Sequence, residues 1–102
     1  MRIAAIEWDD DNRSHFADHG RCGEQAVTEI IVSKCHRSRA VDIDRKADDE
    51  PRRLIYGQTC SGRFLVVLAT PRGKGVLRPI SCWPLSDKSL ERYLAWRKSL
   101  PK

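Results

Sequence analysis

The stretch QTCSGRFLVVLATPRGKGVLRPISCWPLS, residues 58–86, decides the predicted fold of this chain. It contains six consecutive apolar residues, Phe64–Ala69, several of them β-branched or aromatic. The run is too short for a free-standing helix, and Gly62 and Pro71 bound it closely. It therefore predicts a strand that is buried on both faces of a sheet.

The residues after this run predict a hairpin. Pro71–Gly75 is a loop rich in turn-forming residues, and the chain then returns as a second strand over Val76–Trp83. Pro79 has no N–H to donate, so we expect this strand to be an edge strand or to be bulged at that point. A bulge would also change which of its alternate residues face the core. Four cations lie on or beside the hairpin: Arg63, Arg72, Lys74 and Arg78.

Outside the hairpin, the apolar spacing predicts three strands and three helices. We expect strands over 3–8, 40–44 and 53–59, and helices over about 10–19, 24–32 and 87–100. Ser86 is placed to cap the last helix. The expected inward face of that helix consists of Leu90, Tyr93, Leu94, Trp96, Arg97 and Leu100. The predicted fold class is α+β, a mostly antiparallel four- to five-stranded sheet with two N-terminal helices and one C-terminal helix.

The length and composition of the chain predict one globular domain over residues 1–102. Of its residues, 40% are hydrophobic and 32% are charged. No apolar run approaches the roughly 20 residues that cross a bilayer, so no membrane partner is expected. Acidic residues begin at Glu7, which leaves no room for the apolar core of a signal peptide. The predicted compartment is therefore the cytoplasm.

Charge is divided unevenly between the two halves of the sequence. Residues 1–51 hold 8 Lys/Arg and 12 Asp/Glu, whereas residues 52–102 hold 11 and 2, so the halves carry −4 and +9. A contiguous half with this excess of cations favours a polyanionic partner such as nucleic acid. The alternative is a set of solvated cations that only keeps the protein dissolved.

Four widely spaced cysteines, Cys22, Cys35, Cys60 and Cys82, contain no C-x-x-C pair. A zinc knuckle needs closely paired ligands, and a disulfide framework needs a secreted protein. We therefore predict reduced and mostly buried thiols. His15 and His19 lie one helical turn apart but have no clear third ligand, so neither a metal site nor a cofactor is expected.

Several short motifs, in order and with fitting spacing, resemble the BrnT family of toxins, which belong to the RelE-like ribonucleases of bacterial type II toxin–antitoxin pairs. The resemblance covers about residues 6–97. Its motifs are Glu7-Trp8-Asp9, His19-Gly20, Gly57 to Thr59, Gly62-Arg63 before the apolar strand, Arg78-Pro79-Ile80-Ser81, and Glu91-Arg92-Tyr93.

The resemblance implies a RelE-like toxin that cleaves RNA without a metal ion. It also implies neutralisation by a small antitoxin with a ribbon-helix-helix DNA-binding part, and repression of the pair's own promoter DNA by the complex. Two positions differ from the family pattern: Asp18 replaces a Lys, and Cys82-Trp83 replaces Ala-Arg. The alternative is therefore a catalytically inactive nucleic-acid- or partner-binding module on the same fold.

Metal-free RNA cleavage needs a base for the 2′-OH, cations that stabilise the phosphorane, and an acid for the leaving 5′-oxygen. Arg63 and Arg78 are the predicted phosphate-binding cations, because a guanidinium contacts two phosphate oxygens and stays charged. His19 is the predicted acid–base group, since its ordinary pKa lies near neutrality. For each Arg, the alternative is an ion pair with an acid or a side chain that lies along the sheet with its stem packed. For His19 the alternative is a hydrogen bond at the helix end.

A second set of residues is predicted to form a wider nucleic-acid-binding surface: Arg53, Arg72, Lys74, Trp83, Lys88 and Arg92. Each cation alone is equally well explained as a solvated side chain. Trp83 either closes the core or offers its ring to an unpaired base. Trp8, Tyr93 and Trp96 are expected to be packing residues.

Overall fold

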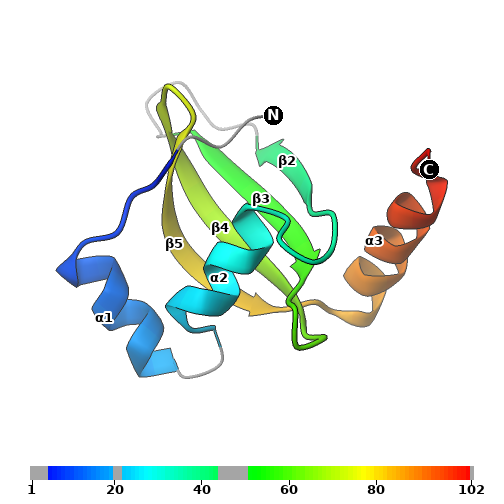
Figure 1. Ribbon diagram of the computed structural model, residues 1–102, viewed down its shortest axis with the longest axis horizontal. Coiled ribbons are helices and arrows are strands. Elements are labelled where there is room, and N and C mark those ends of the chain that lie inside the picture. The colour runs from blue at the N-terminus through cyan, green and yellow to red at the C-terminus, as the bar shows by residue number, and fades with distance from the viewer. Residues whose placement is uncertain (1–4, 20–21, 44–50, 102) are drawn as a thin grey trace.

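The computed structural model describes residues 5–19, 22–43 and 51–101, with only the backbone described for 17–19. Its elements follow the order β-α-α-β-β-β-β-α that the sequence predicts (Figure 1). They are β1 (Ala5–Ile6), α1 (Asp10–His19), α2 (Glu24–Ile31), β2 (Arg39–Ile43), β3 (Arg52–Gln58), β4 (Phe64–Gly73), β5 (Val76–Pro84) and α3 (Asp87–Ser99). The first strand was predicted over 3–8; residues 3 and 4 lie outside the described residues.

One five-stranded mixed sheet carries the fold, in the strand order β1-β5-β4-β3-β2. Three neighbouring pairs are antiparallel, and β1 alone runs parallel to its neighbour β5. The α+β class and the strand number are as predicted. The sheet puts the apolar run of β4 at its centre, where Leu65, Val66 and Val67 are buried.

The second strand of the central hairpin is bulged where the proline predicts it. Leu68 pairs with Ser81 but Ala69 pairs with Pro79, so Ile80 has no partner on β4. The extra residue changes the parity of β5, because Leu77 and Pro79 face the same side as Cys82. The prediction of a bulge is therefore confirmed.

Helices α1 and α2 cover one face of the sheet, which we call the helix face (Figure 1). Their buried residues Phe16, Val27 and Ile30 form one core cluster with strand residues such as Ile55 and Val67. Trp8 packs against this cluster, with its ring centroid 5.6 Å from that of Phe16. The core thus lies between α1, α2 and the helix face.

Polar residues define where the helices begin, as the sequence predicts. At α1, the Asp9 carboxylate accepts from the Asn12 N–H at 3.0 Å, and the Asn12 side chain accepts from the Asp9 N–H at 2.8 Å. At α3, the Ser86 hydroxyl oxygen accepts from the Ser89 N–H at 3.2 Å. The bonds from the Asn12 and Ser89 N–H groups satisfy donors that the first turn of each helix leaves free.

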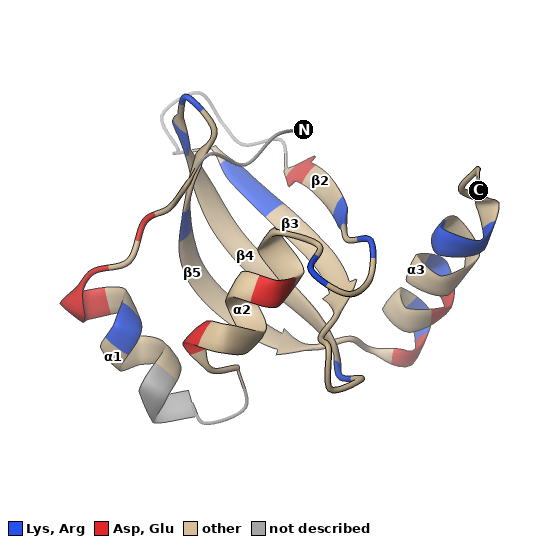
Figure 2. Cartoon of the chain, viewed as in Figure 1, with Lys and Arg blue, Asp and Glu red and all other residues tan. Residues whose placement is uncertain are grey.

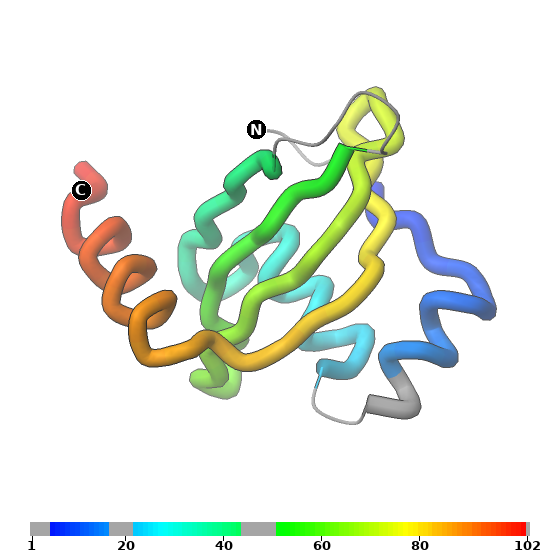
Figure 3. Tube along the Cα trace, turned by 180° about the vertical axis from the view of Figure 1, so that it is seen from behind, coloured from blue at the N-terminus to red at the C-terminus, as the bar shows by residue number. Residues whose placement is uncertain are grey.

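Helix α3 projects from the end of the sheet and buries less of its surface than predicted (Figure 3). Only Tyr93 is fully buried, and Leu94, predicted to face inward, is 38% exposed. The reason is that α3 meets the sheet near the ends of β2 and β3, where the Tyr93 hydroxyl donates to the Arg37 carbonyl at 2.6 Å. The predicted inward face is therefore correct for Tyr93 and wrong for Leu94, and Leu90, Trp96, Arg97 and Leu100 are half-buried.

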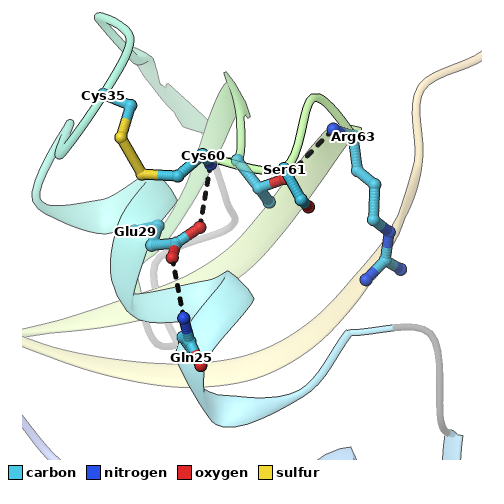
Figure 4. Close-up of a disulfide and its surroundings, with 7 residues drawn as sticks. Gln25, Glu29, Cys35, Cys60, Ser61 and Arg63 are labelled. Carbon is cyan, nitrogen blue, oxygen red and sulfur yellow. Dashed lines mark hydrogen bonds between the residues drawn. A yellow bond between two sulfur atoms is a disulfide. The ribbon is translucent and has the colours of Figure 1, made fainter.

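The cysteine prediction is also wrong in part, because Cys35 and Cys60 form a disulfide (Figure 4). Both residues are exposed. The bond joins the segment after α2 to the turn between β3 and β4, so these two cysteines meet through the fold and not through sequence spacing. Cys22 is a buried free thiol as predicted, and Cys82 is a partly buried one.

No helix in the described part of the chain is both long and apolar enough to span a bilayer.

Candidate nucleic-acid interface

The face of the sheet opposite α1 and α2 carries no helix across its centre (Figure 3). We call it the open face. Strand register assigns residues to it, because side chains alternate between the two faces of a sheet. Val66, Leu68 and Thr70 of β4 lie on this face, since Leu65, Val67 and Ala69 belong to the core.

The register places the residues of the open face in three rows across the strands. The first row is Arg39–Tyr56–Val66–Trp83, and the second is Val41–Leu54–Leu68–Ser81. The third contains Arg78 opposite Thr70, with Arg52 next to them on β3 and Ile43 opposite Arg52. Arginines and aromatic rings thus lie in the outer rows, and apolar residues lie between them.

The third row contains a cluster of four charges, which we call the Glu7 cluster. Arg78 donates from the same Nη1 to Glu7 Oε2 at 2.8 Å and to Asp9 Oδ2 at 2.5 Å. Arg72 Nε lies 3.6 Å from the same Oε2 of Glu7. Two of the predicted cations, Arg72 and Arg78, therefore converge on one carboxylate oxygen.

Local structure explains why these side chains meet. β1 pairs with β5 in parallel, Ile6 opposite Leu77, so Glu7 comes beside Arg78. Arg72 lies at a register shift between Pro71 and Gly73, and such a bulge redirects a side chain. The adjoining turn has positive φ at Lys74 and Gly75, 56° and 79°, as two-residue hairpin turns require.

The ion pairs fix the charge state of the Glu7 cluster. The hydrogen bond from Arg78, followed by one from the Asn12 backbone, lowers the pKa of Asp9 below its ordinary value of 3.8. The hydrogen bonds that Arg78 donates raise its own pKa, and the one to Asp9 has a larger effect than the one to Glu7. At neutral pH the cluster therefore holds an ionised Asp9 and a permanently charged Arg78. Glu7 is 39% exposed and remains open to solvent on one side.

A pocket of about 190 Å³ opens at the other end of the open face, between β2, β3 and α3. We call it the tyrosine–arginine pocket. Its lining residues are Arg39, Val41, Tyr56, Ser89, Arg92 and Tyr93. The Arg39 guanidinium lies 5.9 Å from the centre of the Trp96 ring. Among the described residues, neither Arg39 nor Arg92 forms an ion pair.

Arg63 does not join Arg78. It precedes β4 and lines a second pocket, of about 330 Å³, on the helix side, with Glu29, Thr59 and Ser61 among its neighbours (Figure 4). Arg78 lies opposite Thr70, seven residues further along β4, or roughly 23 Å at strand spacing. The two predicted phosphate-binding cations are therefore on different faces, and one phosphate cannot contact both.

His19 is the last residue of α1, and its side chain lies outside the described residues. Nine residues separate its backbone from Asp10 at the start of the helix, about 14 Å along the axis. Asp9 of the Glu7 cluster is at that start. The backbone therefore places His19 away from the cluster.

The remaining predicted residues are dispersed. Arg53 is on the helix face of β3 and pairs with Asp42 at 2.6 Å. Lys74 is exposed at the hairpin tip, and Lys88 is exposed on α3. Trp83 is 42% exposed on the open face, which leaves its ring available for stacking. Figure 2 shows basic residues over the hairpin, the strands and α3, with others on α1 and after α2, and acidic residues at the start of α1.

Sequence reasoning did not identify Glu7, Arg39 or Tyr56 as site residues. Glu7 belongs to the Glu7-Trp8-Asp9 motif, and an acid after a short apolar strand was the available signal. Arg39 and Tyr56 have no comparable signal, because they become neighbours only through the pairing of β2 with β3.

The described residues contain no group of three His, Cys, Asp or Glu side chains that could hold a metal ion. Comparison with protein-family models, curated proteins and solved structures finds no match for this chain. Function must therefore be argued from the residues and their geometry.

Proposed function

We propose that this protein is a metal-independent ribonuclease of toxin type, which cleaves RNA at the Glu7 cluster. The observation that carries the proposal is the convergence of Arg72 and Arg78 on the Glu7 carboxylate, on the open face of the sheet. The resemblance to BrnT toxins supports the same reaction class. The net +9 of residues 52–102 supports a polyanionic substrate.

In this proposal Glu7 is the general base and the two arginines are the electrostatic catalysts. The Glu7 carboxylate takes the proton from the 2′-OH, and the 2′-oxygen attacks the adjacent phosphorus. Arg72 and Arg78 hydrogen-bond the non-bridging oxygens, where negative charge increases in the transition state. The bond to the 5′-oxygen then breaks and leaves a 2′,3′-cyclic phosphate. Asp9, the other carboxylate of the cluster, is ionised and already accepts from Arg78, so the leaving oxygen takes its proton from water.

The further parts of the proposal come from the resemblance alone. They are a RelE-like relationship, neutralisation by a ribbon-helix-helix antitoxin, and control of the pair's promoter DNA by the complex. The proposed cytoplasmic location comes from the sequence itself and not from the resemblance.

A second function, a nucleic-acid-binding module without catalysis, is supported by a different observation. Arg78 already donates to both Glu7 and Asp9, so its charge is largely neutralised before any phosphate binds. In that case the Glu7 cluster only holds the start of α1 against β5, and RNA binds elsewhere on the open face.

The test is cleavage of a mixed-sequence RNA in excess chelator by the purified protein and by its Glu7→Gln variant. Gln keeps the size of Glu and can still accept from Arg78, but it cannot take a proton. We expect the variant to cleave at least 100-fold more slowly, the usual contribution of a general base.

Glu91→Gln is the matched control, because Glu91 is exposed on α3 and lies outside the Glu7 cluster. It should cleave like the parent protein, and both variants should unfold at similar urea concentrations. If the Glu7→Gln variant cleaved RNA as fast as the parent protein, this result would overturn the catalytic role of Glu7. No cleavage by the folded parent protein would favour the binding module.

A further inference from the structure

We infer that the tyrosine–arginine pocket between β2, β3 and α3 binds an unpaired nucleotide several positions away from the cleaved phosphate. This inference rests on the proposed function for the identity of the substrate as RNA. It adds that the substrate is single-stranded and that recognition is divided between two ends of the open face.

The pocket combines the two chemical features that an unpaired nucleotide needs. Tyr56 presents a half-buried aromatic ring, on which any base can stack, and the buried Tyr93 forms the wall of the pocket beside it. Arg39 and Arg92 present guanidinium groups that form no ion pair within the described part of the chain and can bind phosphate oxygens. Ser89 adds a hydroxyl that can donate to or accept from a base edge.

The pocket is built on fixed elements, so its shape does not depend on a ligand. The Tyr93 side chain is 1% exposed, and its hydroxyl bonds the Arg37 carbonyl at 2.6 Å. Arg97 donates to Gln58 Oε1 at 2.8 Å and ties α3 to the end of β3. Tyr56 pairs with Arg39 and Val66 in the sheet. Aromatic and cationic groups are thus positioned before binding, which lowers the entropy cost of association.

The distance between this pocket and the Glu7 cluster implies a strand of several nucleotides. Tyr56 and Val66 lie four residues along the strands from the row of Thr70 and Arg78, which is about 13 Å. Three strand spacings, about 14 Å, separate β5 from β2 across the sheet. A dinucleotide at the Glu7 cluster therefore cannot reach Arg39.

Charge and aromatic character continue between the two ends. Trp83 lies in the same row as Tyr56, and Arg52 lies in the row of Arg78, with Thr70 between the two arginines. An extended strand can therefore cross the open face with bases on the apolar middle row and phosphates near the arginines. A duplex has its bases paired and stacked, so it cannot place one against a tyrosine ring.

The experiment measures equilibrium binding by fluorescence anisotropy, with labelled 2′-O-methyl RNA that lacks the attacking hydroxyl and cannot be cleaved. Two probes are used, a single strand of about 12 nucleotides and a dinucleotide. The variants are Arg92→Ala and Arg39→Ala. Arg13→Ala is the matched control, because Arg13 of α1 pairs with Glu24 of α2 and is not on the open face.

We expect Arg92→Ala and Arg39→Ala each to weaken binding of the 12-nucleotide probe about tenfold, as loss of a charged hydrogen bond does. Binding of the dinucleotide should not change, and Arg13→Ala should bind both probes like the parent protein. A blunt duplex of the same sequence should bind the parent and Arg92→Ala equally. Arg92 forms no hydrogen bond, ion pair or ring contact with the described residues, so this variant should fold even where Arg39→Ala, which loses its contact with Trp96, does not.

Equal effects on both probes, or no effect of Arg92→Ala on the 12-nucleotide probe, would overturn the inference. These outcomes are independent of cleavage. Loss of binding in Arg92→Ala together with absence of cleavage by the parent protein would contradict the proposed ribonuclease and keep the nucleotide pocket.

Discussion

Glu29 shows how a single carboxylate is kept ionised inside this fold. It is 6% exposed, and its two oxygens accept from the Cys60 N–H at 2.9 Å and from Gln25 Nε2 at 3.1 Å (Figure 4). Both hydrogen bonds lower the pKa of Glu29 below its ordinary value of 4.5, and the one from the Cys60 N–H has a larger effect than the one from Gln25. The pKa of Glu29 is lower in the folded protein than in the unfolded protein. The stabilisation that these two hydrogen bonds give is therefore complete above about pH 4.5 and is lost as the pH falls through the lowered pKa.

The corresponding prediction concerns Glu29→Gln. At pH 7 the variant should unfold at a lower urea concentration than the parent protein, since an amide cannot accept from both donors. The difference should shrink below about pH 4, where the parent also loses its charge. Glu24→Gln, on the exposed side of the same helix, should show a much smaller difference. A difference for Glu29→Gln that is the same at pH 7 and pH 3 would contradict this explanation.

Single residues also show what the sequence can predict of the site. The flanking apolar residues and the motif around Arg78 identified it as a cation of the central hairpin, which the structure confirms. Its pairing with Glu7 and Asp9 could not be predicted, because it depends on β1 lying parallel to β5 across about 70 residues of sequence. The separation of Arg63 from Arg78 could not be predicted either, because it depends on the face of the sheet that each residue occupies.

At the scale of elements, the packing of α2 on β3 depends on the absence of a side chain at Gly57. A Cβ atom there would lie 2.6 Å from Ser38 Oγ and 3.1 Å from Ile30 Cγ2. The same Ser38 hydroxyl donates to the Ile30 carbonyl at 2.5 Å, so this contact has no spare room. A Cβ atom at Gly23, in contrast, would meet nothing within 4 Å.

We therefore predict opposite outcomes for one substitution at two glycines. Gly57→Ser should lower the free energy of unfolding by about 1–3 kcal/mol, the usual cost of overpacking. Gly23→Ser should leave it unchanged or raise it by a few tenths, because Gly23 is the N-cap of α2 and Ser is a better cap. Urea unfolding of both variants measures this. Equal destabilisation by the two substitutions would show that backbone freedom, and not the contact with α2, decides the effect.

Most elements were predictable because their signals are local. Apolar periodicity, capping residues and turn residues are enough for α1, α2, α3 and the central hairpin. The orientation of α3 was not predictable in the same way. Its apolar stripe indicates an inward face, but the amount of sheet available to cover that face is a property of the whole fold, and Leu94 remains exposed.

At the scale of the whole molecule, the Cys35–Cys60 disulfide closes a loop across 25 residues of sequence. Loop-closure entropy for that length corresponds to about 3.5 kcal/mol of stabilisation. We predict that the double variant Cys35→Ser/Cys60→Ser has a free energy of unfolding lower by about that amount. The parent protein in a reductant should unfold like the variant, and the variant should not respond to the reductant.

Thiol counting in denaturant provides the direct check. The oxidised parent protein should show the two free thiols of Cys22 and Cys82, and the reduced protein should show four. Four thiols without reductant would contradict the disulfide. The sequence alone misled here, since widely spaced cysteines gave no sign of pairing, and only the approach of the β3–β4 turn to the end of α2 brings them together.

The parallel pairing of β1 with β5 has a consequence for biosynthesis. A ribosome delivers β1 before the other described strands, but the strand that must receive it, β5, is the last of the sheet to emerge. Contacts between such distant segments form late, because the intervening chain must first be ordered. An unfinished chain therefore carries Glu7 without Arg78 beside it. If the Glu7 cluster is the cleavage site, the nascent protein stays harmless to the messenger from which it is being translated until β5 has been made.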